Sequence, residues 1–592
     1  MKKIYGFFGA AAILMLAACS KDFDGPKAPE SEGDIYMTMT ISAQLGTGTR
    51  TSTPNQGVEV GKDKENKITD GLLILAEPKT VGDGYEVFAS SELASGKIIG
   101  NGSNYAASFQ MVRADILAAI GDSESKEYYL FVIANYTKAG ISKPNKGADV
   151  QQILDMADPS AIWSDNNFLM TNAEYAKTTI KKDDVQPGMH TTQATALNLG
   201  HVKVQRIMSR FDIAAEVKDT DFTVKYEYEV QVPAEPEQQE GPTTERKTYT
   251  TTVKFDAVTL VNMAQKFNRF KEVGTEQGTF GSEWDYFLPE TGFVEGTSTS
   301  NYVFSPMQTG FTYPLFMDEG ETKVVNGKLT GKQVNLETGG GEDNSLKFIY
   351  TTLESLVDEN NADDPNYTHT GASSEPNYYI WRYCTENTNY DKDNQKNGNS
   401  TGIIFRAILS GTPFTEAAGE PVYAYGNVVL GKAAKLRAYV NGNDPGDDVY
   451  GFIKAKYDAA VAELKSQEGK DTWTEDGDSF SDIDEYLVAN GFTIYKAKDV
   501  DSSKVYYTYY IYWNRHNDNS NNGSMGAMEF ATVRNNVYKL KVKSVLKLGH
   551  PADPNDDPDP NKPDDPDEKE EFWGEVSCEI LPWEVRINGI EF

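Results

Sequence analysis

The feature that most constrains the fold is a strict alternation of side chains near the start of the chain. In residues 34–45 (DIYMTMTISAQL) every second side chain is apolar, which places on one side Ile35, Met37, Met39, Ile41, Ala43 and Leu45. The intervening residues are mostly hydroxyl-bearing or amide side chains. Successive side chains of a strand point to opposite faces of a sheet. The pattern therefore predicts a strand with one buried and one solvated face.

Short segments of strand length recur through the rest of the chain. Apolar or alternating runs occur at 72–76, 128–135, 202–213, 378–383, 402–409, 506–513 and 535–548. Two alternating segments, 224–232 and 248–255, flank a polar loop and predict a long hairpin. Helical patterns are brief, at 111–120, 149–157 and 451–467. Dominant strands with short helices predict a mainly β, sandwich-like fold.

Composition narrows the possible partners and chemistry. The 592 residues carry 56 basic and 89 acidic side chains, a net charge of −33. Phosphate binding needs a basic footprint, so nucleic acid is not an expected partner. Three cysteines exclude a disulfide scaffold, and five scattered histidines offer little for a catalytic metal cluster. We expect neither a cofactor nor a metal.

The first twenty residues predict an exported lipoprotein. Lys2 and Lys3 precede a mostly apolar stretch, 4–18, that is too short for a membrane span and suits a signal peptide. It ends in Leu-Ala-Ala-Cys, which resembles a bacterial lipobox with Cys19 as the lipid-bearing residue. The alternative is a soluble secretory signal with a chance cysteine. The lipid would hold the precursor at a membrane surface.

Composition shifts divide the remaining chain. Residues 551–571 (PADPNDDPDPNKPDDPDEKEE) cannot build a core and predict an extended, self-repelling linker. We expect a signal peptide over 1–18, a lipidated tether with the first strand over 19–50, β-domains over 51–215 and 216–550, the linker, and a C-terminal strand segment over 572–592.

Enzymatic motifs find little support. Residues 398–402 match G-x-S-x-G, but a nucleophile elbow needs a strand before the serine and a helix after it. Here a polar loop precedes Ser400 and an apolar strand pattern follows. No catalytic residue is expected.

The acidic linker does not form a recognisable calcium loop. Asp553, Asn555, Asp557 and Asp559 are spaced by two, but an EF-hand needs glycine at its sixth position and glutamate at its twelfth. The linker has proline and aspartate there. Weak, non-specific attraction of calcium is the remaining possibility.

Two further groups of residues have structural interpretations. Cys384 and Cys578 occupy apolar-type strand positions, which favours core packing, although a disulfide between them stays open. An aromatic cluster could bind glycans or pack on both faces of a strand in a sandwich: Tyr506, Tyr507, Tyr509, Tyr510, Tyr512 and Trp513.

The C-terminal part carries a family resemblance. The run 532–538 (TVRNNVY) is followed by Leu548-Gly549, a Pro/Asp linker and then 581–585 (LPWEV). This order resembles the type V fimbrial, or fimbrillin, family of Bacteroidota, and most of all its minor-fimbrium stalk subunit. Weaker similarities occur at 129–135, 168–172, 206–213 and 386–388.

The resemblance implies a structural protein with two tandem transthyretin-like β-sandwich domains. Such subunits reach the cell surface as lipoproteins, where a trypsin-like, arginine-specific protease removes the first strand. Removal of that strand opens a groove, and a strand from an identical subunit then fills it. Tip and anchor subunits complete the fimbria.

Two positions fit this implied scheme. The first strand is followed by a Gly/Thr loop with a lone Arg50, so the mature chain would begin at Thr51. Near the C-terminus, alternating apolar residues predict a donor strand, with Asn588-Gly589 as a bulge: Trp583, Val585, Ile587, Ile590 and Phe592. The extended linker over 551–571 would allow this strand to reach a neighbouring subunit.

Other functions remain open at this point. A surface glycan-binding lipoprotein would share the lipobox and the aromatic residues, and would lack a removable first strand. A tip or anchor subunit of the same fimbria is a closer alternative, and an anchor would keep both its lipid and its first strand.

Overall fold

The structure, a computed structural model, describes the greater part of the chain. The described residues are 34–43, 62–81, 84–93, 98–101, 104–137, 139–150, 167–232, 243–261, 264, 268–274, 288, 301–305, 323–325, 328–330, 333–334, 342–343, 350–356, 367–368, 378–388, 395, 400–426, 428–442, 448–475, 477–517, 524–551 and 575–582. Cys19, Leu45, Arg50 and Thr51, the linker beyond Pro551, and the predicted donor residues 583–592 lie outside them. Within these ranges no helix is long and apolar enough to cross a membrane.

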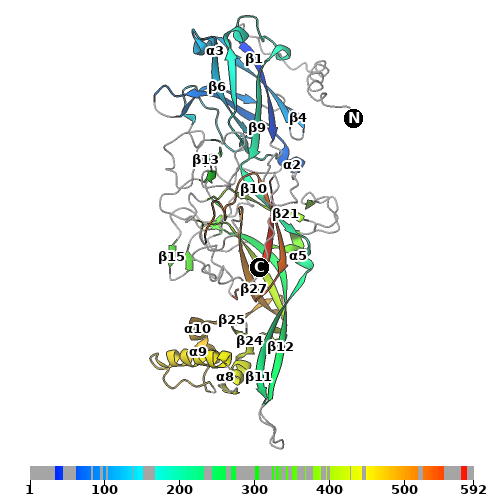
Figure 1. The fold of residues 1–592 in the computed structure, drawn as a ribbon, viewed down its shortest axis with the longest axis vertical. Helices are drawn as coiled ribbons and strands as arrows, with labels where there is room; N and C mark the ends of the chain where they lie inside the picture. Colours follow the sequence, from blue (N-terminus) through cyan, green and yellow to red (C-terminus); the bar gives the residue numbers. More distant parts are fainter. Residues whose placement is uncertain are drawn as a thin grey trace, which may run out of the picture.

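The N-terminal body is built on one nine-stranded sheet. Its strands lie in the order β3-β2-β6-β7-β9-β1-β5-β4, and β8 pairs with β6 (Figure 1). Their bounds are β1 Asp34–Ala43, β2 Gly71–Pro78, β3 Tyr85–Leu93, β4 Ile98–Asn101, β5 Asn104–Val112, β6 Ser125–Ala134, β7 Met170–Asn172, β8 Lys177–Lys181 and β9 Leu197–Arg206. Helices α2 (Asp63–Asn66) and α3 (Arg113–Ile120) and the 3₁₀ turns η2 (Lys182–Val185) and η3 (Gln193–Thr195) accompany them.

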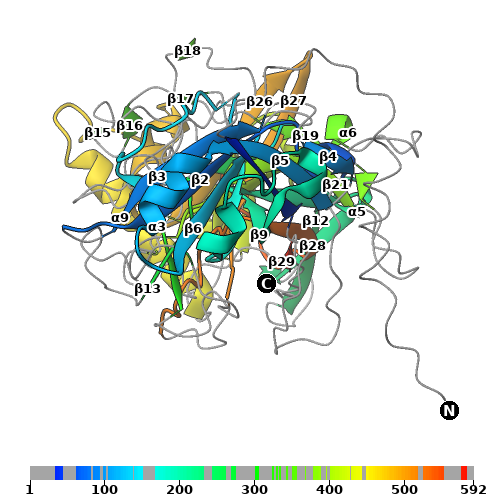
Figure 2. The ribbon, with the colours of Figure 1, turned by 90° about the horizontal axis from the view of Figure 1, so that it is seen from above.

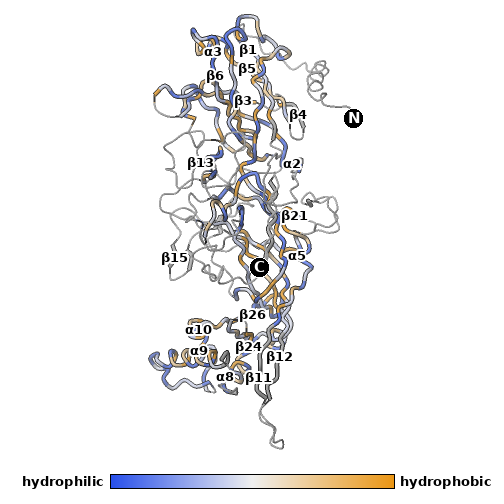
Figure 3. Tube along the Cα trace, viewed as in Figure 1, coloured by the Kyte–Doolittle hydropathy of each residue, from blue (hydrophilic) through white to orange (hydrophobic). Residues whose placement is uncertain are grey.

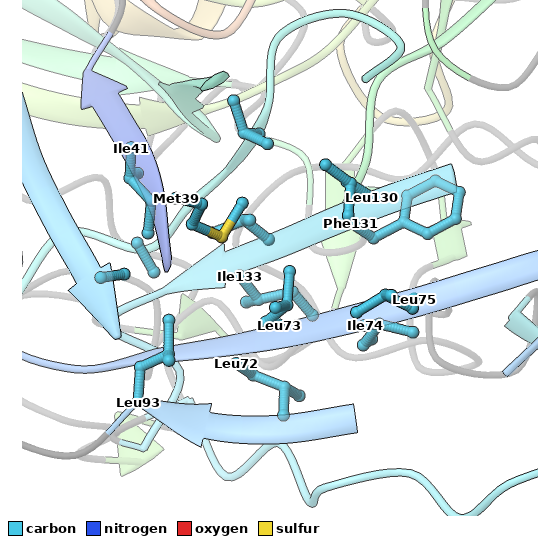
Figure 4. Packing of buried hydrophobic residues seen from close by; sticks show 14 of the residues in the cluster. Met39, Ile41, Leu72, Leu73, Ile74, Leu75, Leu93, Leu130, Phe131 and Ile133 are labelled. Carbon is cyan, nitrogen blue, oxygen red and sulfur yellow. The ribbon is translucent and has the colours of Figure 1, made fainter. Parts of the chain in front are cut away.

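Two groups of strands in this sheet face each other across a core. The three-residue β7 joins β6 to β9, and β3 contacts β5 although they lie far apart in the strand order. The enclosed cluster combines side chains of β1, β2, β3, β6 and β9. Figure 4 shows Met39 and Ile41 of β1 in the same core as Leu72 and Leu73 of β2 and Ile133 of β6.

The chain passes into a second body at Ile207. Residues 202–213 look like one strand in sequence, but β9 ends at Arg206 and β10 (Met208–Ala214) belongs to a different sheet. That sheet has the order β20-β21-β10-β28-β29, with β20 Tyr367–Thr368, β21 Tyr378–Thr385, β28 Asn536–Ser544 and β29 Glu575–Pro582. The predicted strands at 378–383 and 535–548 are confirmed as β21 and β28.

A six-stranded sheet covers the other side of the second core. Its order is β11-β12-β22-β27-β26, with β19 on β12. The bounds are β11 Asp221–Val232, β12 Thr243–Val261, β19 Thr351–Thr352, β22 Gly402–Gly411, β26 Ala497–Val500 and β27 Ser503–Trp513. β11 and β12 form the predicted long hairpin, in register from Asp221↔Lys254 to Val232↔Thr243.

Aromatic rings fill the space between these two sheets. Phe211 of β10 stacks on Tyr538 of β28 at 4.9 Å between ring centroids, and Phe255 of β12 contacts Tyr510 of β27 at 5.4 Å. In Figure 3 hydrophobic and hydrophilic positions are interspersed along the strands of both bodies. Alternating side chains thus place one face of each strand in a core.

A smaller mixed unit lies to one side, and sequence patterns indicated only part of it. It contains β23 (Val422–Tyr425), β24 (Val428–Lys432), β25 (Phe492–Tyr495), α8 (Ala433–Gly442), α9 (Asp448–Lys465), η6 (Phe480–Ile483) and α10 (Asp484–Ala489). These elements share their own apolar cluster. The helix predicted at 451–467 is confirmed as α9, which projects sideways in Figures 1 and 2.

The remaining described elements are short. They are α5 Glu216–Asp219, α6 Leu353–Leu356, α7 Phe414–Ala417, β13 Glu272–Gly274, β14 Tyr302–Phe304, β15 Lys323–Val325, β16 Lys328–Thr330, β17 Gln333–Val334 and β18 Glu342–Asp343. The prediction of a mainly β chain with several sheets is confirmed. The transthyretin-like topology, the signal peptide and the domain limits stay predictions.

Candidate functional site

β1 is an inner strand of its sheet, although it is the first described segment of the chain. It pairs antiparallel with β5, from Asp34↔Val112 to Ser42↔Asn104. On its other edge it pairs in parallel with β9, from Met37↔Leu197 to Ala43↔Val204. Both rows of backbone hydrogen-bonding groups on β1 therefore face a neighbour.

The apolar face predicted for β1 is buried. Ile35, Met37, Met39 and Ile41 are each at most 1% exposed. On the opposite face Thr40 is exposed, which confirms the alternation. Burying four such side chains contributes on the order of 6–12 kcal/mol before the cost of ordering the strand.

Polar contacts also hold the beginning of β1. The Tyr36 amide donates a hydrogen bond to the carbonyl of His190 at 2.9 Å. The buried Arg113 guanidinium donates to the carbonyls of Met189 at 2.5 Å and Asp34 at 3.4 Å. The Thr38 hydroxyl donates to the Ala107 carbonyl on β5 at 3.0 Å. Most of these contacts use backbone groups, so they depend little on the sequence of the strand.

The predicted processing site falls between two anchored elements. β1 ends at Ala43, and the next described residue is Lys62 at the start of α2. The Lys62 amide donates to the Glu65 carboxylate at 2.6 Å. A cut after Arg50 would thus break the covalent link between β1 and α2.

β29 has a different setting. It stands at the end of its sheet and pairs antiparallel with β28, from Asn536↔Pro582 to Ser544↔Glu575. Its last residue, Pro582, directly precedes the predicted donor residues. The last described strand of the second body is therefore an edge strand, and it directly precedes the segment predicted to reach a neighbour.

The motif that carries the family resemblance performs a structural task. Arg534 is fully buried and forms an ion pair with Glu386, with both N–O distances at 2.9 Å. Its guanidinium also donates to the carbonyls of Asn268 at 2.6 Å and Arg269 at 3.0 Å. The similarities noted separately at 386–388 and 532–538 thus belong to one contact. Sequence reasoning noted both segments but not their pairing.

A second buried cluster lies where the two bodies meet, and sequence reasoning missed it. Glu65 of α2 accepts hydrogen bonds from Arg210 of β10 at 3.0 Å and from the Tyr383 hydroxyl of β21 at 2.6 Å. Asp212 accepts two more from Arg210, each at 2.8 Å. Glu65 and Arg210 are 145 residues apart, so no local pattern connects them.

Of the residues considered for catalysis or metal binding, Ser400 and His516 are buried, whereas the linker residues considered for calcium lie outside the described residues. Ser400 is buried and lies just before β22, so a strand follows it as the sequence indicated. His516 is buried beside the Tyr538 hydroxyl, 3.0 Å away. Among the described residues no group of three or more His, Cys, Asp or Glu side chains could hold a metal ion.

Cys384 and the aromatic cluster contribute to the core. Cys384 has a free, buried thiol, and burial raises its pKa above the ordinary value. Tyr506, Tyr510 and Tyr512 belong to the core between the two sheets, while Tyr509 packs against Ile404 on the other face. Aromatic side chains therefore pack on both faces of β27, which is the structural alternative to a glycan-binding surface.

Comparison with known families matches the C-terminal part of the chain. Residues 504–588 match the family model described as "Major fimbrial subunit protein type IV, Fimbrillin, C-terminal". This segment covers β27 from its second residue and all of β28 and β29, and it includes both the TVRNNVY and LPWEV runs. No curated protein matches the chain.

Solved structures align with most of the chain, at low sequence identity and low TM-scores. A candidate cell adhesion protein from Parabacteroides distasonis aligns at 12% identity and a TM-score of 0.36, covering 93% of this chain and 98% of its own. A fimbrilin from Porphyromonas gingivalis aligns at 13% identity and a TM-score of 0.31, with coverages of 93% and 98%.

Proposed function

We propose that this protein is a structural subunit of a surface fimbria that polymerises by protease-triggered strand exchange and supports adhesion. The single observation that carries the proposal is the position of β1, an inner strand supplied by the extreme N-terminal part of the chain. The fimbrillin match over residues 504–588 supports the same function.

Removal of β1 would create an acceptor for another strand. It would unpair β5 and β9 along their facing edges and uncover the side chains that now pack on Ile35, Met37, Met39 and Ile41. Unpaired strand edges and an apolar slot are a template for an added strand. No cofactor or energy source would be needed once the original strand is released.

We assign the release to cleavage after Arg50 by a trypsin-like, arginine-specific protease, and the replacement to residues 583–592 of an identical subunit. The donor's alternating apolar residues match the character of the slot. Within the fimbria we place the chain in the stalk, because a stalk subunit must both accept and donate a strand. A tip or anchor position is the alternative. The precursor would travel as an outer-membrane lipoprotein through Cys19.

Deletion of 583–592 tests this function. The truncated protein should fold, lose its N-terminal segment and remain monomeric, because it can accept a strand but cannot donate one. Electron microscopy of sheared surface material, with circular dichroism of the purified subunit, would show this. Fibres of wild-type length from the truncated protein would refute the proposal, and so would loss of folding, which would make the segment part of its own core.

A further inference from the structure

The cluster around Glu65 contains four buried charges of balanced sign. Glu65 and Asp212 are acidic, Arg206 and Arg210 are basic, and each is at most 2% exposed. Burial lowers the pKa of the Arg206 guanidinium to about 10, which leaves it charged at neutral pH. Charges of this kind are tolerated inside a protein only when partners hold them in a fixed geometry.

The partners come from both bodies of the subunit. Arg206, the last residue of β9, donates from Nε to the Glu65 carbonyl at 3.1 Å and from Nη1 to the Asn535 side chain at 3.1 Å. The backbone N–H of Asn535 in turn donates a hydrogen bond to the carbonyl of Met208, at the start of β10, at 2.7 Å. Together with the Glu65–Arg210 pair, these bonds join α2 and β9 to β10 and the segment before β28.

A neighbouring contact fastens the same junction. The Arg269 carbonyl accepts hydrogen bonds from Arg534 at 3.0 Å and from the Thr171 hydroxyl at 2.7 Å. Thr171 belongs to β7 in the first body, and Arg534 precedes β28 in the second. Phe270 also packs edge-on against Phe131 of β6 at 5.7 Å. Reorientation of the bodies would break both sets of contacts.

The junction lies on a short path between the two ends that strand exchange would use. β9 lines the site of β1, and only Ile207 separates it from β10. β10 pairs with β28, and β28 pairs with β29, which leads into residues 583–592. Tension between neighbouring subunits would therefore pass through β9, β10, β28 and β29, close to the buried charges.

We propose that the Glu65 cluster is a rigid joint that fixes the orientation of the two bodies and thereby makes the assembled fibre stiff. The inference rests on the proposed fimbrial function. Tilting one body would separate Glu65 from Arg210 and Arg206 from Asn535, and would leave charges in an interior without water to replace their partners. A polar cluster satisfied in one arrangement favours that arrangement over all others.

The first test uses the uncleaved full chain as a monomer. Glu65→Gln removes the charge that faces Arg210. In this variant the hydrogen-exchange protection factors of backbone amides in α2, at the end of β9 and at the start of β10 should fall at least tenfold. Small-angle scattering should show a broader range of shapes. The matched control is Asp458→Asn, which breaks an exposed pair with Lys454 at 2.7 Å and should leave both measurements unchanged.

The second test uses fibres, and Tyr383→Phe covers the case in which Glu65→Gln does not fold. Tyr383→Phe removes only the hydroxyl that donates to Glu65, and it should produce the same changes to a smaller degree. Fibres of either variant should have a persistence length at least twofold shorter than wild type in electron micrographs. A folded Glu65→Gln monomer with wild-type hydrogen exchange and scattering would refute the proposed joint. Variant monomers with faster exchange that still form fibres of wild-type stiffness would refute it as well. Because exchange and scattering need no polymerisation, a joint that fails is distinguishable from a failed fimbrial function, in which wild-type protein forms no fibres.

Discussion

β1 and β29 are the first and last described strands, and they differ in how many neighbours they have. β1 lies between β5 and β9, whereas β29 stands at the end of its sheet beside β28. Loss of β1 would unpair two strands and uncover a core, whereas loss of β29 would expose one edge of β28. A strand that replaced β1 would therefore have to pair on both sides and cover a core, whereas β29 lies at an edge, directly before the segment proposed to pair with a neighbour.

The largest effect is expected at Arg50, since the proposed cleavage there would decide whether β1 can leave. Arg50→Ala should abolish fibres and accumulate unpolymerised, lipid-tethered precursor, measured by electron microscopy and immunoblotting of surface fractions. Arg50→Lys is the matched variant, because an arginine-specific protease should process it poorly. Normal fibres from Arg50→Ala whose subunits start beyond residue 45 would show that this cut is not the trigger.

The next effect concerns the lipid proposed for Cys19, which lies on the β1 side of the proposed cut. Palmitate should label the precursor and be lost in Cys19→Ala, which should also fail to reach the surface. Fibres should carry no label, because their subunits would begin at Thr51. Unchanged labelling of Cys19→Ala would end the lipoprotein interpretation, and labelled subunits within fibres would mean that β1 stays.

A cavity on β1 should affect the precursor and spare the fibre. Met39→Ala should destabilise the uncleaved subunit by about 2–5 kcal/mol, because Met39 is buried in the core. Chemical denaturation of the monomer measures this, with the exposed Thr40→Ala as a control near zero. Fibres assembled from either variant should melt like wild type. An equal loss in fibres would indicate that β1 remains in the groove after assembly.

The smallest effect is expected from a single hydrogen bond on β1. Thr38→Val keeps the shape of the side chain and removes its bond to the Ala107 carbonyl on β5. The uncleaved subunit should lose about 0.5–1.5 kcal/mol of unfolding free energy. The fibre should again be unaffected, and a change of similar size there would contradict the proposed exchange.

Local patterns predicted the individual strands well. The alternation over residues 34–45 predicted the buried face of β1, and the two alternating segments around 233–242 predicted the β11–β12 hairpin. Both patterns arise because successive side chains of a strand point to opposite faces of the sheet. A strand with one buried face therefore alternates apolar and polar residues.

Long-range relations could not be predicted in the same way. Residues 202–213 form a continuous strand pattern, and nothing local indicates that the chain changes sheets at Ile207. The pairing of Glu65 with Arg210 joins residues far apart in sequence, and each residue alone looks like an ordinary surface charge. The place of β1 between β5 and β9 depends likewise on the assembled sheet.

The most direct test of the account is whether the C-terminal segment of one subunit occupies the place of β1 in the next. Ala106 of β5 is opposite Thr40 on the outer face of the sheet, so a cysteine there leaves the core intact. Ala106→Cys should be combined in turn with Glu584→Cys, Arg586→Cys or Asn588→Cys, which alternate with the apolar donor residues. Oxidised fibres of at least one pair should give a ladder of covalent oligomers on non-reducing gels. Intact fibres from all three pairs without any link between subunits would contradict strand exchange at this site.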